Sequence, residues 1–115
     1  MSALTSHVLD LASGQPARGL AVRLEILDGE QWRTLADRIT DADGRISDFV
    51  PAGALGAATY RLTFATGDYQ RAAGRPVFYP WVEIIFTVAH TSAPAQHHHI
   101  PLLLSPFGYS TYRGS

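Results

Sequence analysis

The feature that most restricts the fold of this chain is an alternation of apolar and polar residues with a period of two. It is clearest in residues 20–27, where an apolar set alternates with a more polar one: Leu20, Val22, Leu24 and Ile26 against Ala21, Arg23 and Glu25. Because successive side chains of a β-strand point to opposite faces of its sheet, this pattern indicates a strand with one buried face and one wet face.

The same alternation recurs along most of the chain. It predicts further strands over residues 4–11, 32–39, 59–64, 82–90, 97–105 and 109–114, with a short piece at 45–47. Asp28-Gly29 and Asp43-Gly44 are hairpin turn signals, and Ser105-Pro106-Phe107-Gly108 is a further turn by its proline and glycine. The strands are therefore short and closely spaced.

A helix fits only residues 66–74, where Thr66 or Asp68 can cap its start and Gly74 can end it. A succession of short strands with a single helical interruption predicts an all-β fold, an antiparallel β-sandwich. The length of 115 residues suits one domain, residues 1–115.

Composition excludes several kinds of function. The chain contains no cysteine, so thiol catalysis, disulfides and zinc-thiolate sites are impossible. Its formal net charge of −1 gives no electrostatic reason to expect nucleic acid or an anionic membrane as a partner. The first residues form no charged leader, and no apolar run approaches the ~20 residues of a membrane span. We therefore expect a cytoplasmic protein without nucleic-acid or membrane partners.

Residues 96–115 combine histidines, a leucine run and aromatic residues. Read as a strand, residues 97–105 present two faces, a core face with His98, Ile100, Leu102 and Leu104 and a second face with His97, His99, Pro101 and Leu103. After the turn, Ser110 and Tyr112 fall on the same side as His99. The segment therefore predicts a terminal hairpin that displays these three residues together.

This ending resembles that of the transthyretin-like family, in particular of its 5-hydroxyisourate hydrolases. The resemblance is carried by His99-Ile100-Pro101-Leu102-Leu103-Leu104-Ser105-Pro106 and by Tyr109-Ser110-Thr111-Tyr112-Arg113-Gly114-Ser115. It implies a sandwich of two four-stranded sheets with one short helix, and a homotetramer (a dimer of dimers) with active sites in the channel between the dimers. It also implies hydrolysis of 5-hydroxyisourate, the unstable product of urate oxidation, to 2-oxo-4-hydroxy-4-carboxy-5-ureidoimidazoline without a cofactor.

The resemblance extends to two segments outside the tail. Ser6-His7-Val8-Leu9-Asp10 is similar to a hydrolase segment whose histidine lines the active site, and Asp43-Gly44-Arg45 is similar to one whose arginine faces the substrate. The catalytic residues that it implies are His7, Arg45 and His99. Together with hydroxyl groups of the tail, the candidates for binding substrate or orienting water are His7, Arg45, Ser110, Tyr112 and Ser115. One residue departs from the motif, because His98 stands where the hydrolases have tyrosine, on the core-facing side.

The residue types suit direct attack of water on a ring carbonyl. A neutral imidazole, with a pKa of about 6.5, can deprotonate the water, a role that the sequence leaves open between His7 and His99. The planar guanidinium of Arg45 can dock the oxygens of the substrate and offset the negative charge that develops on the attacked carbonyl.

Each group also has a simpler interpretation. Taken alone, His7 is a surface histidine and Arg45 is a solvated arginine near a turn. His7, His97 and His99 would suit zinc or copper, but the sequence supplies no supporting carboxylates, so we expect only adventitious metal binding. Asp41 and Asp43 lack the remaining ligands of a calcium loop.

Two other functions compete with hydrolysis. The first is a non-enzymatic carrier of transthyretin type that binds a small aromatic ligand in the same channel, although such an apolar site has no use for the histidines and Arg45. The second is a metal-binding or scaffold protein built on the histidine cluster, which the missing leader and carboxylates disfavour. The sequence therefore favours a hydrolase without a metal or cofactor.

Overall fold

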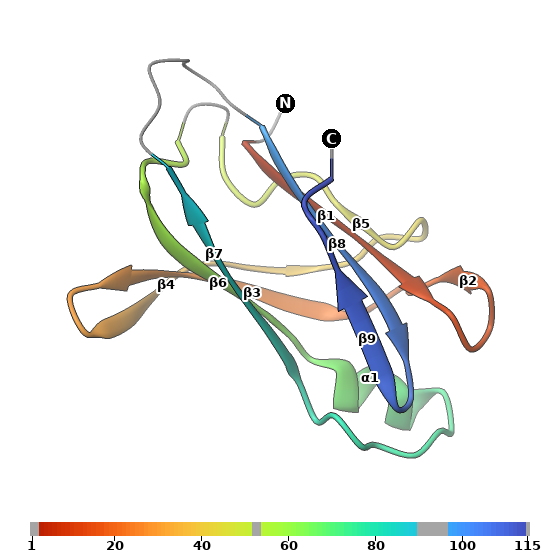
Figure 1. The fold of residues 1–115 in the computed structure, drawn as a ribbon. Coiled ribbons are helices and arrows are strands. Elements are labelled where there is room, and N and C mark those ends of the chain that lie inside the picture. The colour runs from red at the N-terminus through yellow and green to blue at the C-terminus, as the bar shows by residue number, and fades with distance from the viewer. Residues whose placement is uncertain (1–2, 52–53, 90–96, 115) are drawn as a thin grey trace.

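The computed structural model describes residues 3–51, 54–89 and 97–114, which form two packed β-sheets and one helix (Figure 1). The elements in chain order are β1 (Leu4–Asp10), β2 (Gln15–Pro16), β3 (Ala21–Asp28), β4 (Gln31–Ile39), β5 (Arg45–Ile46), β6 (Ala58–Phe64), α1 (Thr66–Ala72), β7 (Val82–Val88), β8 (His98–Ser105) and β9 (Gly108–Thr111). The first sheet has the order β2-β1-β8-β9, with β5 also paired to β1, and the second has the order β4-β3-β6-β7.

The predicted β-sandwich with one short helix is confirmed, but one pairing differs from the antiparallel expectation. The pairs of the second sheet are antiparallel, whereas β1 and β8 run parallel, from Leu4 beside His98 to Asp10 beside Leu104. Parallel neighbours need a long crossover, and here the whole second sheet lies in that connection. Side chains alternate in both kinds of strand, so the sequence pattern could not reveal this pairing. The two-residue strands β2 and β5 also give the first sheet five strands instead of four.

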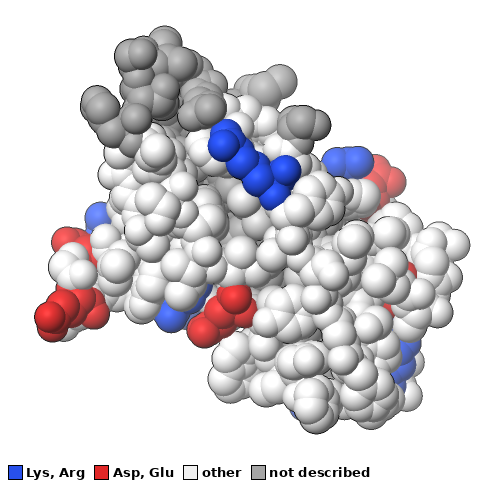
Figure 2. Space-filling model, in the orientation of Figure 1, with Lys and Arg blue, Asp and Glu red and all other residues white. Residues whose placement is uncertain are grey.

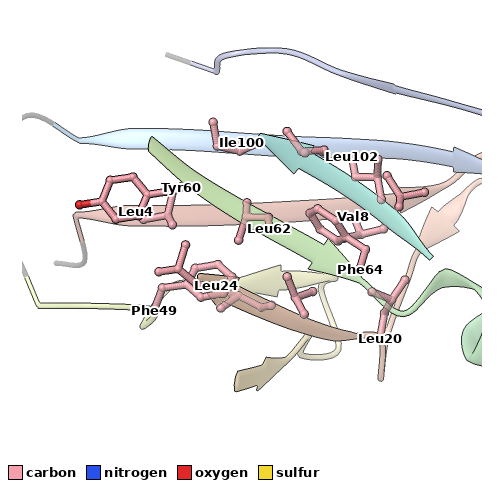
Figure 3. Packing of buried hydrophobic residues seen from close by; sticks show 14 of the residues in the cluster. Leu4, Val8, Leu20, Leu24, Phe49, Tyr60, Leu62, Phe64, Ile100 and Leu102 are labelled. Carbon is pink, nitrogen blue, oxygen red and sulfur yellow. The ribbon is translucent and has the colours of Figure 1, made fainter. Parts of the chain in front are cut away.

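The core lies between the sheets and is built from the inward-facing residues that the alternation predicts (Figure 3). Leu4 and Val8 of β1, Leu62 and Phe64 of β6, and Leu102 of β8 are all 0% exposed. Burying a side chain of this size contributes about 1.5–3 kcal/mol. The inner faces of β1 and β8 are thus fully used for packing, and their remaining residues project from the outer face.

Helix α1 lies where the sequence predicts it, but the predicted cap is wrong. The N-cap residue is Ala65, and no side chain caps the helix. The buried hydroxyl of Thr66 donates instead to the carbonyl oxygen of Tyr79 at 2.9 Å, so a tertiary contact uses the group assigned to capping. The other end agrees with the prediction, because Gly74 follows the helix in a left-handed conformation, with a φ of 73°.

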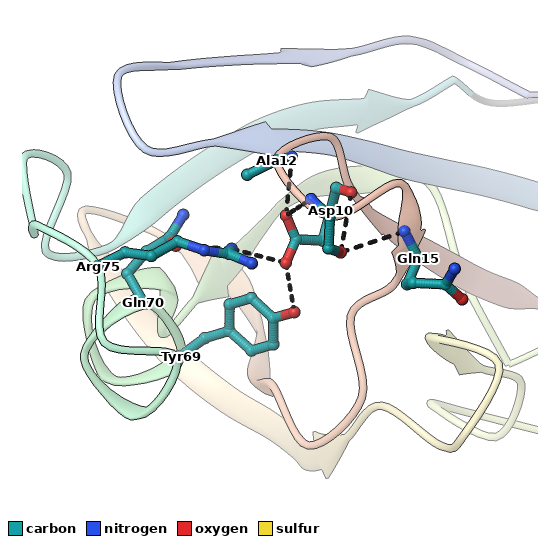
Figure 4. Close-up of polar contacts among 7 residues, drawn as sticks. Asp10, Ala12, Gln15, Tyr69, Gln70 and Arg75 are labelled. Atoms are coloured by element: carbon teal, nitrogen blue, oxygen red, sulfur yellow. Dashed lines mark hydrogen bonds and ion pairs between the residues drawn. The ribbon is translucent and has the colours of Figure 1, made fainter.

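A buried carboxylate fixes α1 to the end of β1 (Figure 4). Oδ2 of Asp10 accepts hydrogen bonds from the hydroxyl of Tyr69 and from Nη1 of Arg75, both at 2.7 Å. Its Oδ1 accepts from the backbone N–H groups of Ala12 and Ser13 at 3.0 and 3.3 Å. Burial alone would raise the pKa of Asp10, but the hydrogen bonds from Tyr69 and Arg75 outweigh it, so this pKa lies below its usual value. Burial and the contact with Asp10 raise the pKa of Tyr69 to about 12.

The surface shown in Figure 2 is mostly uncharged, with separate small patches of arginine and of acidic side chains. None of the helices in the described part of the chain is long and apolar enough to cross a membrane.

Candidate active site

The outer face of the first sheet carries the polar residues of β1 and β8. Val8 and Leu102 point into the core (Figure 3). The odd-numbered residues of the same strands, Thr5, His7 and His99, therefore lie on the outer face, where each is partly buried. Thr5 stands directly opposite His99 in the parallel register. The parallel pairing thus brings together two segments that lie near opposite ends of the sequence.

Arg45 reaches the same face through a tight turn. Gly44 has a φ of 72°, and Oδ1 of Asp41 accepts hydrogen bonds from the N–H groups of Asp43 and Arg45 at 2.9 and 3.0 Å. A Cβ on Gly44 would lie 2.5 Å from a backbone oxygen of β1, so glycine is needed for the close approach as well as for the turn. Strand β5 then pairs with β1 so that Arg45 stands opposite His7. None of the ion pairs among the described residues involves Arg45.

A hydroxyl group links two imidazoles on this face. Oγ1 of Thr5 lies 2.9 Å from Nε2 of His97 and 2.8 Å from Nδ1 of His99. The centroids of the two rings are 6.4 Å apart, and their planes are inclined by 29°. The two histidines are therefore neighbours, joined through Thr5.

The environment of His99 favours its neutral form. Burial lowers the pKa of His99, and the positive charge of Arg45 lowers it further. His97 and His7 act in the same direction, against a hydrogen bond with the backbone of Thr5. Because an unperturbed histidine has a pKa of about 6.5, His99 is mainly neutral at pH 7 and can accept a proton.

The last described residues pass beside His99. Gly114 forms an isolated bridge with His99, and its N–H donates to the carbonyl oxygen of His99 at 2.7 Å. A Cβ on Gly114 would lie only 2.5 Å from Cδ2 of the imidazole. Gly114 is not among the glycines with a positive φ, so its backbone conformation alone does not demand glycine. Glycine is needed here because the imidazole of His99, in its present orientation, approaches too closely for a Cβ.

Of the hydroxyl residues predicted in the tail, Ser110 lies farther from the histidines. Ser110 pairs with Leu103, four residues beyond His99 on β8, which is about 13 Å at ~3.3 Å per residue. Tyr112 follows the end of β9 and is 57% exposed, and Ser115 lies outside the described residues. Within one chain, the structure brings His7 and Arg45 to the face of His99 but leaves Ser110 apart.

Sequence reasoning did not single out Thr5 or Gly114 as site residues. The spacing of two residues between Thr5 and His7 places them on the same face, but only the pairing of β1 with β8 puts Thr5 against His99. For the adventitious metal site predicted at the histidines, the described residues contain no group of three or more histidine, cysteine, aspartate or glutamate side chains arranged to hold an ion.

The fold and this face define a β-sandwich of the transthyretin class. The model of the HIUase/Transthyretin family matches residues 4–114, and the chain belongs to this family. The chain is 50% identical to the 5-hydroxyisourate hydrolase of Caulobacter vibrioides over 100% of both chains. It is 45% identical to the 5-hydroxyisourate hydrolase of Mus musculus, over 99% of this chain and 96% of the mouse protein.

Solved structures show that proteins with two different names share the fold. A 5-hydroxyisourate hydrolase from Klebsiella pneumoniae has a TM-score of 0.85 at 42% identity, covering 100% of both chains. Sea bream transthyretin in complex with thyroxine has a TM-score of 0.90 at 31% identity, covering 97% of this chain and 94% of that chain. Similarity of backbone therefore does not separate the two, and an assignment of activity depends on the side chains of the site.

Proposed function

We propose that this protein hydrolyses 5-hydroxyisourate to 2-oxo-4-hydroxy-4-carboxy-5-ureidoimidazoline in the degradation of urate. The observation that carries the proposal is the convergence of His7, Arg45 and His99 on one face of the first sheet, with His99 mainly neutral. The names of the relatives from Caulobacter vibrioides and Mus musculus support the same activity.

In the mechanism that we propose, His99 is the general base. Its neutral imidazole takes a proton from a water molecule as the water oxygen bonds to a ring carbonyl carbon. Arg45 stabilises the negative charge on the carbonyl oxygen, which is the kind of electrostatic help that often dominates acyl chemistry. The bond between this carbon and the ring nitrogen then breaks, and the nitrogen takes its electron pair and the proton held by His99. His7, opposite Arg45, helps to bind and orient the substrate.

The site that we propose is completed by other subunits. The histidine face, the outer face of the first sheet with Thr5, His7 and His99, lies on the outside of the sandwich that the described residues form, and we propose that a second chain across from it closes the pocket. We propose a homotetramer, a dimer of dimers, in which Tyr112, Ser110 and Ser115 also contact substrate. The separation of about 13 Å along β8 between His99 and Leu103, the pairing partner of Ser110, supports a contribution of Ser110 to a site shared between chains. Light scattering that gives the mass of an active monomer would contradict this arrangement.

The proposal also covers the domain organisation, the compartment and the cofactor requirement expected from the sequence. We propose that residues 1–115 act as one domain in the cytoplasm, without nucleic acid or membrane as a partner and without a cofactor. Activity that survives a chelator is the expected result for a site in which histidine, and no metal ion, activates the water.

The experiment that tests the function follows the ultraviolet absorbance of freshly generated 5-hydroxyisourate with and without the purified protein. We expect the protein to accelerate the decay and His99→Ala to lose most of this acceleration while keeping its circular dichroism spectrum. Near-normal turnover by His99→Ala would remove His99 from the mechanism. If the folded oligomer does not accelerate the decay, the protein is better explained as a carrier of a small aromatic ligand, since it also resembles the sea bream complex.

A further inference from the structure

The hydroxyl of Thr5 lies within hydrogen-bond distance of two imidazole nitrogens, Nε2 of His97 at 2.9 Å and Nδ1 of His99 at 2.8 Å. A hydroxyl has a single proton to donate and can accept hydrogen bonds at the same time. A neutral imidazole likewise has one N–H and one acceptor nitrogen. When the hydroxyl proton of Thr5 points at one of the two imidazoles, the other imidazole donates to Thr5, so the three groups share their protons in one of two directions.

In the first direction, Nδ1–H of His99 donates to Thr5 and the hydroxyl of Thr5 donates to Nε2 of His97. Nε2 of His99 then has a free lone pair and can take a proton. In the opposite direction, Nε2–H of His97 donates to Thr5, and Thr5 donates to Nδ1 of His99. Nε2 of His99 then already carries its proton, and His99 cannot act as a base. The direction of the hydrogen bonds thus decides whether His99 can accept a proton at Nε2.

The hydrogen bonds of the first direction also stay intact when a proton is transferred to His99. When Nε2 of His99 takes a proton, the resulting imidazolium has an N–H on both nitrogens. Its Nδ1–H continues to donate to Thr5, and Thr5 continues to donate to His97. No hydrogen bond has to be reversed during the reaction, which is the property expected of a preorganised base.

Two contacts hold the imidazole of His99 on both sides of Cγ. Thr5 engages Nδ1 on one side, and Gly114 lies so close on the other that a Cβ there would be 2.5 Å from Cδ2. Nε2 belongs to the far end of the ring, beyond the two atoms that these contacts engage. It is thus the nitrogen left for water or substrate.

We propose that Thr5 is a positioning residue which, together with His97, fixes the tautomer of His99 so that Nε2 is the acceptor nitrogen of the general base. The proposal rests on the proposed function of His99 and assigns to the threonine of β1 a part in the reaction without contact with the substrate. The arrangement follows the logic of a nucleophile–base pair in which a third group orients the imidazole.

The first test reads the tautomer directly and does not need turnover. In the ¹⁵N-labelled oligomer at pH 8, correlation spectra of the imidazole nitrogens identify which nitrogen of His99 carries the proton. We expect Nδ1–H in the wild-type protein and a shift of the population toward Nε2–H in Thr5→Val, which keeps the branched shape and lacks the hydroxyl. Thr5→Ser, which keeps the hydroxyl, should restore the wild-type tautomer.

The second test uses the same variants in the hydrolysis assay. Thr5→Val should lower kcat by about tenfold to a hundredfold with little change in KM, within the range that general base catalysis supplies, and Thr5→Ser should recover most of the loss. Thr59→Val is the matched control, because Thr59 also shares a hydroxyl contact, 3.1 Å from Thr87, but on the second sheet. It should leave kcat and the tautomer unchanged.

The outcomes separate this proposal from the function itself. A Thr5→Val protein with an unchanged His99 tautomer, or with a wild-type kcat, would overturn the role of Thr5 even if the protein is a hydrolase. A wild-type protein with no hydrolase activity would overturn the proposed function, whatever the spectra show.

Discussion

The outer faces of the two sheets differ in whether a carboxylate forms an ion pair with their arginines. On the second sheet, Nη2 of Arg61 lies 2.9 Å from Oε1 of Glu25, and the guanidinium carbon stands 4.3 Å from the ring centre of Trp32. Arg23 on the same face is paired with Asp37 at 2.8 Å. Carboxylates of the same sheet thus largely neutralise these arginines, which therefore attract an anionic ligand only weakly.

On the first sheet, Arg45 has no carboxylate partner of this kind among the described residues, and it stands opposite His7. Its charge acts on His99, whose pKa it helps to lower, and also on the carboxylate of Asp41 in the preceding turn, with which it forms no ion pair. The comparison teaches that the number of charges on a face says little about its function. What matters is whether each charge is already neutralised by a neighbour, because only an unpaired guanidinium is free to meet a developing anion.

The largest effect is expected when one arginine is removed from each face, which tests whether the two faces differ in function. Arg45→Ala should reduce kcat/KM by about 10²–10³-fold, because it removes the positive charge offered to the attacked carbonyl. Its stability to urea should stay close to that of the wild-type protein. Arg23→Ala, the matched change on the second sheet, should leave kcat/KM unaltered. Equal losses in both variants would mean that the pairing of charges does not distinguish the faces.

Asp10 extends the comparison to a carboxylate that is fully paired on the core side of the first sheet. Asp10→Asn should lower the free energy of unfolding by about 1–3 kcal/mol, because the amide nitrogen cannot accept from Tyr69 or Arg75. Its kcat should change little. Urea unfolding curves measure the loss, and Asp37→Asn on the exposed pair should show a much smaller one.

The same residue gives a prediction about acid stability. The folded pKa of Asp10 is depressed, so its contribution is present above the unfolded value of about 3.9 and is lost as the pH falls through the folded pKa. The stability of the wild-type protein should therefore decline more steeply in acid than that of Asp10→Asn. Parallel curves for the two proteins would contradict the assignment.

A smaller effect is expected at Gly114, whose backbone packs against the imidazole of His99. Gly114→Ala should reduce kcat by about tenfold, because the new Cβ meets the imidazole of His99 and turns it from its working position. Gly108→Ala is the matched control, since the nearest atom to its Cβ is the Ser105 Oγ at 3.6 Å. If Gly114→Ala is fully active, the close approach of Gly114 does not orient the ring.

The last effect is a shift in pH dependence that the charge of His97 causes, separate from the part of His97 in orienting Thr5. His97→Ala removes one of the groups that lower the pKa of His99, while Arg45 and His7 remain. The pKa of His99 should rise, and since the base works in its neutral form, the acid limb of the kcat/KM profile should move to higher pH. A limb that stays in place or moves to lower pH would show that His97 does not act on the base through its charge.

The sequence predicted the faces of the strands well and the partners of the strands poorly. Alternation alone placed Leu102 in the core and His99 outside, because a strand leaves only two choices for each side chain. It gave no sign that β1 pairs in parallel with β8, and for this reason Thr5 was not expected beside His99. The resemblance to known hydrolases supplied His7 and Arg45, whose residue types alone indicate only a surface histidine and a solvated arginine. The cap predicted for α1 failed because Thr66 contacts Tyr79, a long-range interaction that local propensity does not contain.

The parallel pairing of β1 and β8 also determines when during folding the site can exist. Thr5 and His99 are separated by 94 positions in the sequence, so their contact closes almost the longest loop that this chain can form. Contacts of such long range are slow to form, because the chain loses loop entropy before it gains the contact. On the ribosome, the strands of the second sheet emerge before β8 does, and a nascent chain can pair them while it has no histidine face at all. In a refolding experiment, the return of activity would therefore report the joining of β1 to β8, later than the spectroscopic signal of sheet formation.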